Sequence, residues 1–139
     1  MPTVTVSRHF NASPEQLYAA WLDPASARQW LFATPDGEMV TAEIDARVGG
    51  GFNLTERRED AEAQHLGRYI ELDPPRRIVF DFKVAPYTDE ETRVSIDIAP
   101  ADGGSELTLT HDGVWEDWEE RTRQGWTMIL DNLASVLGE

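Results

Sequence analysis

Alternating apolar and polar side chains open the chain. In residues 3–10, Val4, Val6 and Phe10 share one face, and polar side chains occupy the other. This period of two predicts a strand with one buried face. Arg8 falls on the apolar face, where an unpaired charge would be costly. Unless the register slips by one residue, we expect Arg8 to pair with a carboxylate or to meet an anionic or carbonyl group of a ligand.

Two short helices are expected to follow this strand. Ser13 and Gln16 have the spacing of a capping box, which predicts that a helix begins there. Asp23 and Pro24 end this helix and begin a second one, which carries Trp30. Both helices therefore lie between the first strand and the rest of the chain.

Six further strands are predicted before residue 111. They cover residues 39–46, the segment around Phe52 and Leu54, and residues 67–72, 76–82, 90–98 and 107–110. Glycine and proline clusters at 49–51, 73–75 and 101–104 supply the turns. The charged stretch 56–62 is predicted to form the tip of a hairpin.

The period changes to three or four residues from about position 115. Trp118, Trp126, Leu130 and Leu133 recur at this spacing, which predicts a long amphipathic helix. Acidic side chains in its first turn complement the helix dipole. Gly125 inside this helix costs about 1 kcal/mol relative to alanine. We therefore expect the sheet to approach the helix closely at that point.

This order of elements predicts an α+β fold. One long helix can cover about seven antiparallel strands only if the sheet curves around it. The 139 residues fit a single domain spanning 1–139. The predicted architecture is a helix grip, with the two short helices closing one end.

A series of motifs extends over essentially the whole chain. They read R-H-F-N-A-S-P-E at 8–15, A-W at 20–21, D-P at 23–24, D-A-R-V-G-G-G-F at 45–52, G-R-Y-I-E-L-D-P-P-R-R-I-V-F at 67–80, L-T-L-T-H at 107–111 and G-W at 125–126. In this order and spacing they resemble the family of homologues of the activator of the heat-shock protein 90 ATPase, in its C-terminal domain. That family lies in the START-like (SRPBCC), birch-pollen-allergen-like superfamily. The resemblance implies the helix-grip fold and an internal cavity.

The cavity suggests the leading hypothesis for function. Members of the wider superfamily bind lipids, sterols, polyketides or other apolar molecules, so the resemblance implies binding of a small hydrophobic ligand without recognisable catalysis. Ligand sites are mostly apolar with a few polar groups. The side chains expected to line the cavity are Arg8, Trp21, Trp30, Phe52, Tyr69, Phe80, Phe82, Trp126 and Leu130. The alternative is that these aromatic side chains form a filled core.

An enzyme of the cyclase, dehydratase or hydrolase type is a second hypothesis. Its weak candidates for polar catalytic groups are His111, Arg8 and Tyr69. His111 follows the last strand and is either a hydrogen-bonded strand terminator or a general base at the cavity mouth. The hydroxyls of Tyr69 and Tyr87 either donate to a ligand or face water. Convergence of these groups on one pocket would favour catalysis, and their dispersal would count against it.

Composition excludes several other classes. The formal charge is −14, from 12 basic and 26 acidic residues, which disfavours nucleic acid as a partner. The chain has no cysteine, which excludes disulfides and thiolate sites and is compatible with a cytoplasmic protein. No histidine pair has the helical spacing of a metal site, and no glycine loop has the spacing that cradles phosphate. We therefore expect no metal and no cofactor.

The acidic charge supports a third hypothesis, a chaperone-linked protein-interaction domain in the stress response. Residues 115–120 place two tryptophans among four acids, as either an exposed docking patch or a lid over the cavity. No run of 18 apolar residues occurs, so we expect no membrane insertion. The first six residues do not read as a secretory signal. A homodimer is left open, since symmetric pairs are common among oligomers.

Overall fold

The computed structural model describes residues 3–32, 37–59, 61–85 and 91–138. Its elements, in chain order, are β1 Thr3–Phe10, α1 Pro14–Leu22, α2 Pro24–Trp30, β2 Glu38–Ile44, β3 Gly51–Arg58, β4 Ala61–Asp73, β5 Arg77–Ala85, β6 Thr92–Ala101, β7 Gly104–Asp112, the 3₁₀ helix η1 Glu116–Trp118 and α3 Glu119–Val136. The predicted order of strand, two helices, six strands and long helix is confirmed.

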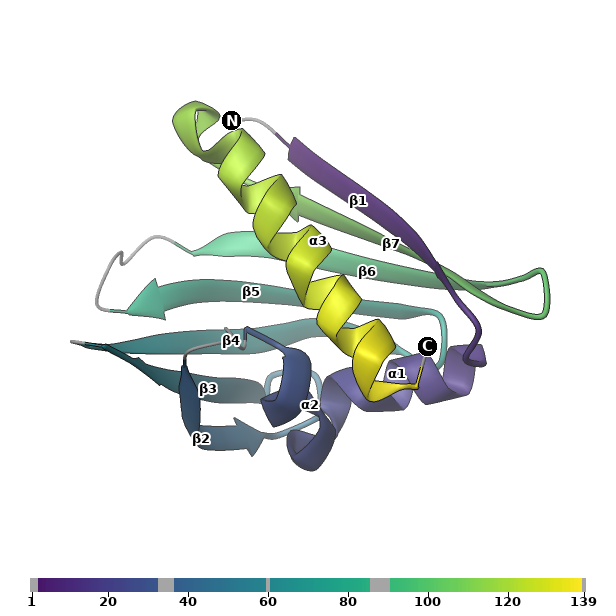
Figure 1. Cartoon of the computed structure of the whole chain (residues 1–139), viewed down its shortest axis with the longest axis horizontal. Helices are drawn as coiled ribbons and strands as arrows, with labels where there is room; N and C mark the ends of the chain where they lie inside the picture. Colours follow the sequence, from purple (N-terminus) through teal and green to yellow (C-terminus); the bar gives the residue numbers. More distant parts are fainter. Residues whose placement is uncertain (1–2, 33–36, 60, 86–90, 139) are drawn as a thin grey trace.

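All seven strands join one antiparallel sheet, in the order β1-β7-β6-β5-β4-β3-β2. The strands β7 back to β2 follow one another as a meander, and β1 pairs with β7 at one edge (Figure 1). Helices α1 and α2 carry the chain from β1 to β2, which lies at the opposite edge. This connection explains why two short helices separate the first strand from the second.

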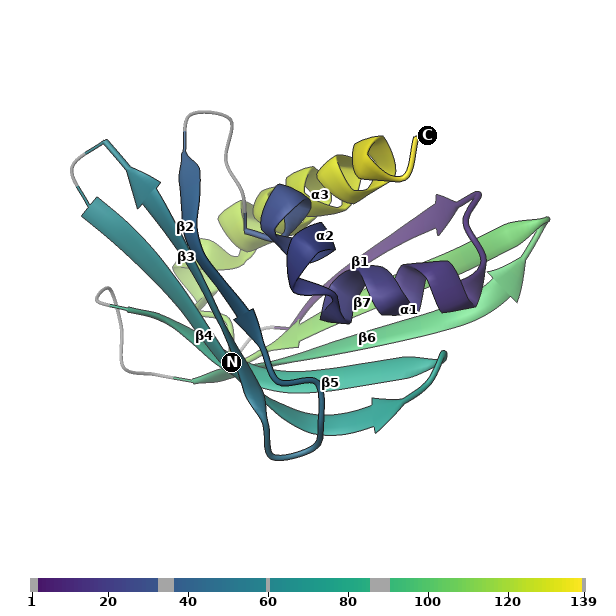
Figure 2. The ribbon, with the colours of Figure 1, turned by 90° about the horizontal axis from the view of Figure 1, so that it is seen from below.

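The sheet curves strongly, and its concave face holds all the helices (Figure 2). Helix α3 crosses this face diagonally, while α1 and α2 cover one end of it (Figures 1 and 2). The inward side chains of the strands and the apolar face of α3 are therefore buried against each other. The structure confirms the predicted helix-grip fold of the START-like type.

Local capping interactions set the start of each short helix. The backbone N–H of Gln16 donates to the Ser13 hydroxyl at 3.2 Å, and the Ser13 N–H donates to the Gln16 side chain at 3.0 Å. The Asp23 carboxylate accepts from the N–H of Ala25 at 3.0 Å and caps α2. Both predicted helix starts are confirmed, because these side chains satisfy N–H groups that the first turn leaves open.

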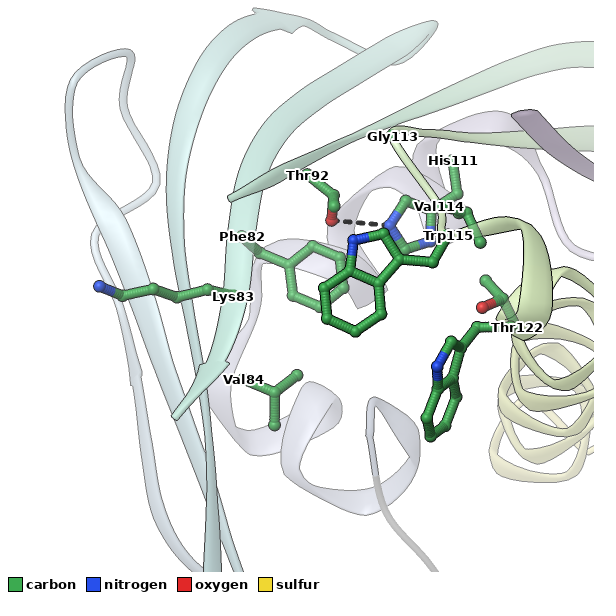
Figure 3. A pocket seen from close by; sticks show the side chains of 10 residues that line it. Phe82, Lys83, Val84, Thr92, His111, Gly113, Val114, Trp115 and Thr122 are labelled. Atoms are coloured by element: carbon green, nitrogen blue, oxygen red, sulfur yellow. Dashed lines mark hydrogen bonds between the residues drawn. The ribbon is translucent and has the colours of Figure 1, made fainter. Parts of the chain in front are cut away.

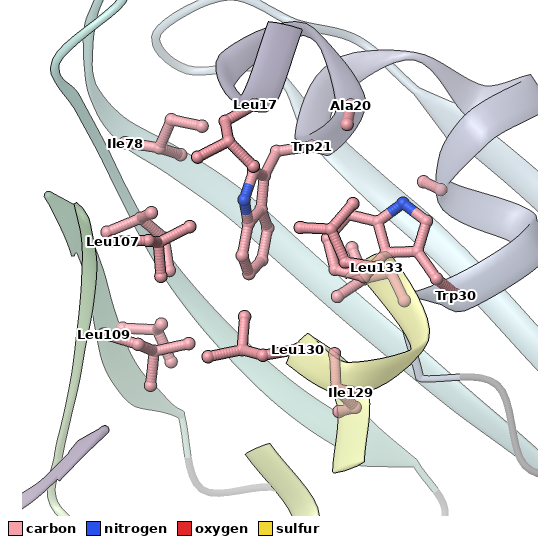
Figure 4. Packing of buried hydrophobic residues seen from close by; sticks show 14 of the residues in the cluster. Leu17, Ala20, Trp21, Trp30, Ile78, Leu107, Leu109, Ile129, Leu130 and Leu133 are labelled. Carbon is pink, nitrogen blue, oxygen red and sulfur yellow. The ribbon is translucent and has the colours of Figure 1, made fainter. Parts of the chain in front are cut away.

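The core lies between the sheet and the three α-helices. Figure 4 shows Trp21 and Trp30 from α1 and α2 meeting leucines of β7 and α3. The two indole rings pack edge to face, with centroids 4.7 Å apart. Leu130 and Leu133 of α3 are almost completely buried in the same cluster. The middle and C-terminal half of α3 therefore packs on this core cluster.

The hairpin predicted within 56–62 is observed between β3 and β4, which pair up to Arg58 and Ala61. Its strands extend further into this charged stretch than expected. Glu56 is buried in β3 and pairs with Arg58 on the same strand at 2.7 Å, so the strand continues through charged residues.

The expected close approach of the sheet to Gly125 is not observed. A β-carbon built on Gly125 meets nothing within 4 Å among the described residues outside its own stretch of helix. The glycine therefore has no packing role in the described structure. Separately, none of the helices within the described ranges is long and apolar enough to cross a membrane.

Candidate functional site

A pocket of about 500 Å³ opens at one end of the concave face, beside the start of α3 (Figure 3). It lies where β5 ends, β6 begins and β7 leads into η1. Its lining is largely apolar and consists of Phe82, Lys83, Val84, Thr92, His111, Gly113, Val114, Trp115, Trp118 and Thr122. The pocket thus combines a largely apolar wall with a few polar side chains, of which Thr92 and His111 are hydrogen-bonded to each other.

The floor of the pocket is continuous with the aromatic core. The ring of Phe82 lies 5.3 Å from that of His111 and 6.3 Å from that of Trp126, centroid to centroid. The rings of His111 and Trp126 are 5.9 Å apart. Phe82 also stacks on Phe32, with the ring centroids 5.5 Å apart. A molecule in the pocket would therefore rest on aromatic rings that the core holds in place.

Two tryptophans form the outer rim. Trp115 and Trp118 are 45% and 46% exposed although both line the pocket. The guanidinium of Arg121 lies 4.9 Å from the ring centre of Trp118, a cation–π contact. Lys83 contributes to the wall, but its side chain extends away from the pocket in Figure 3. The two tryptophans thus line the pocket and also keep apolar surface in water, which is compatible with both alternatives, a lid and a docking patch.

His111 is held by two hydrogen bonds whose directions are fixed by chemistry. The indole N–H of Trp126 donates to Nδ1 of His111 at 3.0 Å, and an indole nitrogen can only donate. Nδ1 is therefore unprotonated, and the proton of the neutral ring lies on Nε2. This Nε2–H donates to Oγ1 of Thr92 at 2.7 Å (Figure 3). Both ring nitrogens of His111 are occupied by protein partners.

The neutral form of His111 is favoured by burial as well. Burial lowers the pKa of His111 to about 4, and the nearby Asp112 carboxylate opposes this only in part. A proton on Nδ1 would also face the N–H of Trp126, placing two donors against each other. His111 is thus a neutral hydrogen-bonding link at ordinary pH.

The predicted cavity residues divide between the pocket and the core. Phe82 lines the pocket, together with the candidate His111. Trp126 lies directly behind them and orients His111. The remaining aromatic and aliphatic candidates are buried in the core cluster: Trp21, Trp30, Phe52, Tyr69, Phe80 and Leu130.

Arg8 lies on the other side of α3, at its contact with β1. Its guanidinium pairs with the carboxylate of Asp131 on α3 and lies 5.4 Å from the ring centre of Phe10. The carboxylate partner corresponds to the structural alternative expected for this residue. Arg8 is not among the side chains that line the described pocket.

Tyr69 is buried among aromatic rings, 5.9 Å from Phe52 and 6.4 Å from Phe80. Burial raises the pKa of its phenol, so the hydroxyl stays protonated. Tyr87, the other tyrosine considered as a donor, lies outside the described residues. The three catalytic candidates are therefore dispersed, with only His111 at the pocket.

A second buried histidine, His65, lies in β4. His65 stacks on Phe32 at 4.2 Å, and its Nδ1 lies 3.0 Å from the carbonyl oxygen of Leu54, to which Nδ1–H donates. Burial lowers the pKa of His65 to about 4. Among the described residues, no group of three or more His, Cys, Asp and Glu side chains could hold a metal ion.

Sequence reasoning missed Thr92 and much of the pocket wall. The alternation of Thr92 with Val94 and Ile96 does place all three on the inner face of β6. That signal could have identified Thr92 as an inward polar group. Nothing in the local sequence could show that Val84, Thr92 and Thr122 meet, because they come from three different elements.

Comparison with known proteins identifies relatives over nearly the whole chain. The model of the family described as "Activator of Hsp90 ATPase homolog 1-like protein" matches residues 11–138. The human Activator of 90 kDa heat shock protein ATPase homolog 1 is 24% identical over 124 residues, which are 88% of this chain. The same match covers 33% of the human protein, so the chain spans about a third of that relative's length.

Solved structures agree with this relationship. A protein from Chromobacterium violaceum is 28% identical, with a TM-score of 0.87 over 96% of this chain and 95% of that chain. A protein from Rhodobacter sphaeroides is 26% identical, with a TM-score of 0.84 over 98% and 92% of the two chains. An AHSA1-like protein from Aeromonas hydrophila, at 23% identity and a TM-score of 0.84 over 99% and 92%, shares the fold.

Proposed function

The chain belongs to the family of Activator of Hsp90 ATPase homolog 1-like proteins, and we propose that it binds a small hydrophobic molecule in the pocket beneath Trp115 and Trp118. The observation that carries this proposal is the pocket itself, with about 500 Å³ of space and a mostly apolar lining. Small-molecule sites commonly have volumes of roughly 300–1,000 Å³ and this kind of wall. The proposal narrows the predicted cavity from the whole helix–sheet interface to its end.

The exposed rim supports the same function. Trp115 and Trp118 together keep large apolar surface in contact with water. A ligand beneath them would remove part of that surface from water, which is favourable in proportion to the apolar area buried. The aromatic floor is already fixed by the core, so little side-chain ordering would oppose binding.

We favour binding without chemistry over an enzyme. The three catalytic candidates are dispersed, and both ring nitrogens of His111 already have protein partners. A general base needs a free lone pair within reach of the substrate. We therefore propose a carrier or sequestering role, acting in the cytoplasm that the cysteine-free composition suits.

The test is a titration with Nile red, a neutral apolar dye whose emission rises in apolar surroundings. Wild type should bind it saturably and one to one. Thr122→Phe, which fills the pocket from α3, should abolish that binding. Gln124→Phe is the matched control, because Gln124 is exposed on the same helix and does not line the pocket. The proposal would be overturned if folded wild type did not bind the dye saturably, or if Thr122→Phe bound it as tightly as wild type.

Exposure of the rim favours a second candidate, docking of a protein partner. Trp115 and Trp118 lie among Glu116, Asp117 and Glu119, which would suit a basic surface with an apolar centre. The name of the human relative suggests the 90 kDa heat-shock protein as the first partner to test, and a role in the stress response. Purified chaperone should then bind wild type at low salt and bind Trp118→Ala more weakly. Failure to bind at low salt would exclude this candidate.

A further inference from the structure

A chain of hydrogen bonds of defined direction ends at the pocket wall. The Trp126 N–H donates to Nδ1 of His111, and the His111 Nε2–H donates to Oγ1 of Thr92. Trp126 and His111 are 3% and 7% exposed, so the first two residues in this series of hydrogen bonds lie inside the protein. Thr92 is half-buried and lines the pocket.

The direction of these hydrogen bonds determines which bonds the Thr92 hydroxyl can still make. A hydroxyl has one proton to donate and two lone pairs. The Nε2–H of His111 occupies one lone pair of Oγ1, and the methyl group of Thr92 faces Gly113, where a β-carbon would lie 3.5 Å from it. Within the described parts of the chain, no residue accepts the hydroxyl proton of Thr92. That proton is therefore available as a hydrogen-bond donor at the pocket wall.

We propose that Thr92 is the specificity-determining donor of this pocket and that the ligand carries an uncharged acceptor oxygen, a ketone, aldehyde or ester carbonyl, on an apolar body. This inference rests on the proposed ligand-binding function and names the class of ligand. A hydroxyl that already accepts from an N–H is polarised and donates more strongly. In an apolar pocket, a ligand oxygen that received this bond would be distinguished from a methylene group of the same shape.

Charge around the pocket favours a neutral carbonyl over a carboxylate. The chain carries a formal charge of −14, and η1 and the first turn of α3 bring Glu116, Asp117, Glu119 and Glu120 next to the rim. Lys83 extends away from the pocket, and the guanidinium of Arg121 covers the ring of Trp118. A carboxylate would lose its hydration on entry without a cation directed into the pocket from the described wall.

The experiment compares two ligands of matched shape, 2-acetylnaphthalene and 2-isopropenylnaphthalene, in which a methylene group replaces the carbonyl oxygen. Each Kd is measured by displacement of Nile red. Thr92→Val keeps the shape of the side chain and removes the hydroxyl. It should weaken binding of the ketone by roughly two- to tenfold, the range of one neutral hydrogen bond, and leave binding of the hydrocarbon unchanged or tighter. Thr92→Ser should restore the affinity for the ketone.

Two controls separate this inference from the function on which it rests. Thr5→Val makes the same substitution at an exposed position of β1 and should change neither Kd. If the hydrocarbon displaces Nile red but Thr92→Val weakens neither ligand, or weakens both equally, the inference is wrong and the binding function stands. If wild type binds Nile red but neither ligand displaces it, the inference is wrong and the binding function stands. If folded wild type does not bind Nile red, both are wrong. Tighter binding of 2-naphthoate than of the ketone would overturn the choice of a neutral ligand.

Discussion

Two buried histidines, His65 and His111, are expected to make the stability of the protein depend on pH. His65 and His111 are 5% and 7% exposed, and burial lowers the pKa of each to about 4. An unfolded histidine has a pKa near 6.5 and takes up a proton first, so the unfolded state binds more protons between these values. The stability from the neutral rings is complete above pH 6.5 and is lost as pH falls.

The expected result is a fall in the free energy of unfolding of roughly 1.2 kcal/mol for each histidine between pH 6 and 5. Urea denaturation at several pH values measures it. His111→Phe keeps an aromatic ring and should remove about half of the pH dependence, although it also destabilises the fold by leaving the Trp126 N–H without an acceptor. If both His111→Phe and His65→Phe kept the wild-type dependence of the free energy of unfolding on pH, the two histidines would not be its source.

Arg8 provides a prediction of the opposite kind, a small effect. Its side chain is 36% exposed and that of its partner Asp131 is 57% exposed. Ion pairs in such positions contribute at most about 1 kcal/mol. Arg8→Met should therefore change the free energy of unfolding by less than about 1 kcal/mol, since methionine still packs on Phe10, and should leave the Kd for Nile red unchanged.

The control for Arg8 is Asp131→Asn, which removes the other charge of the pair. Both variants should have similar, small effects on unfolding in urea. A loss of ligand affinity in Arg8→Met alone would instead support the ligand role that the sequence left open for Arg8. Such a result would require the ligand to extend along α3 as far as β1.

The sequence predicted the positions of individual residues better than the contacts between residues that are distant in sequence. Phe82 and His111, both named as candidates, do line the pocket, and the capping box of Ser13 and Gln16 was predicted correctly because it depends only on positions close in sequence. The sequence could not show that Trp126 donates to His111, because 15 positions and a change of element separate the two. Contacts of that kind depend on how elements pack, which no local pattern encodes.

A single substitution in helix α3 is expected to stabilise the protein. Gly125 lies inside this helix, and a β-carbon there meets nothing within 4 Å among the described residues beyond its own helix. Glycine in a helix interior costs about 1 kcal/mol relative to alanine. Gly125→Ala should therefore raise the free energy of unfolding by about 1 kcal/mol, measured by urea denaturation.

Gly67 in β4 is the matched control, because its surroundings are the opposite. It pairs across the sheet with Phe52, and a β-carbon on Gly67 would overlap the Phe52 ring. Gly67→Ala should destabilise the protein by roughly 1–3 kcal/mol through overpacking. Equal effects of the two substitutions would contradict the packing described for these elements.

Element boundaries show where pattern reasoning stops. The sequence patterns identified the seven strands and the three α-helices, but not the 3₁₀ helix η1, and β4 begins at Ala61, six residues before the predicted strand. Charged residues such as Glu56 and Arg58 were interpreted as turn residues. In the structure they satisfy each other along one strand and allow it to continue.

The molecule as a whole was the most predictable level. A single long helix and seven strands require a curved sheet. The motifs along the chain indicated the family, which the family model confirms. The position of the pocket was not predictable, because it depends on which part of the helix–sheet interface the side chains fill. The homodimer stays a prediction, which sedimentation of the purified protein would test.

The binding site is tested most directly by NMR of the ¹⁵N-labelled protein during titration with 2-acetylnaphthalene. The account predicts saturable shifts of the backbone amides of Val84, Thr92 and Thr122 and of the Trp126 indole N–H, with little change at Trp21 or Trp30. Shifts centred on Trp21 and Trp30, shifts confined to the convex face of the sheet, or no saturable shift at all would contradict it.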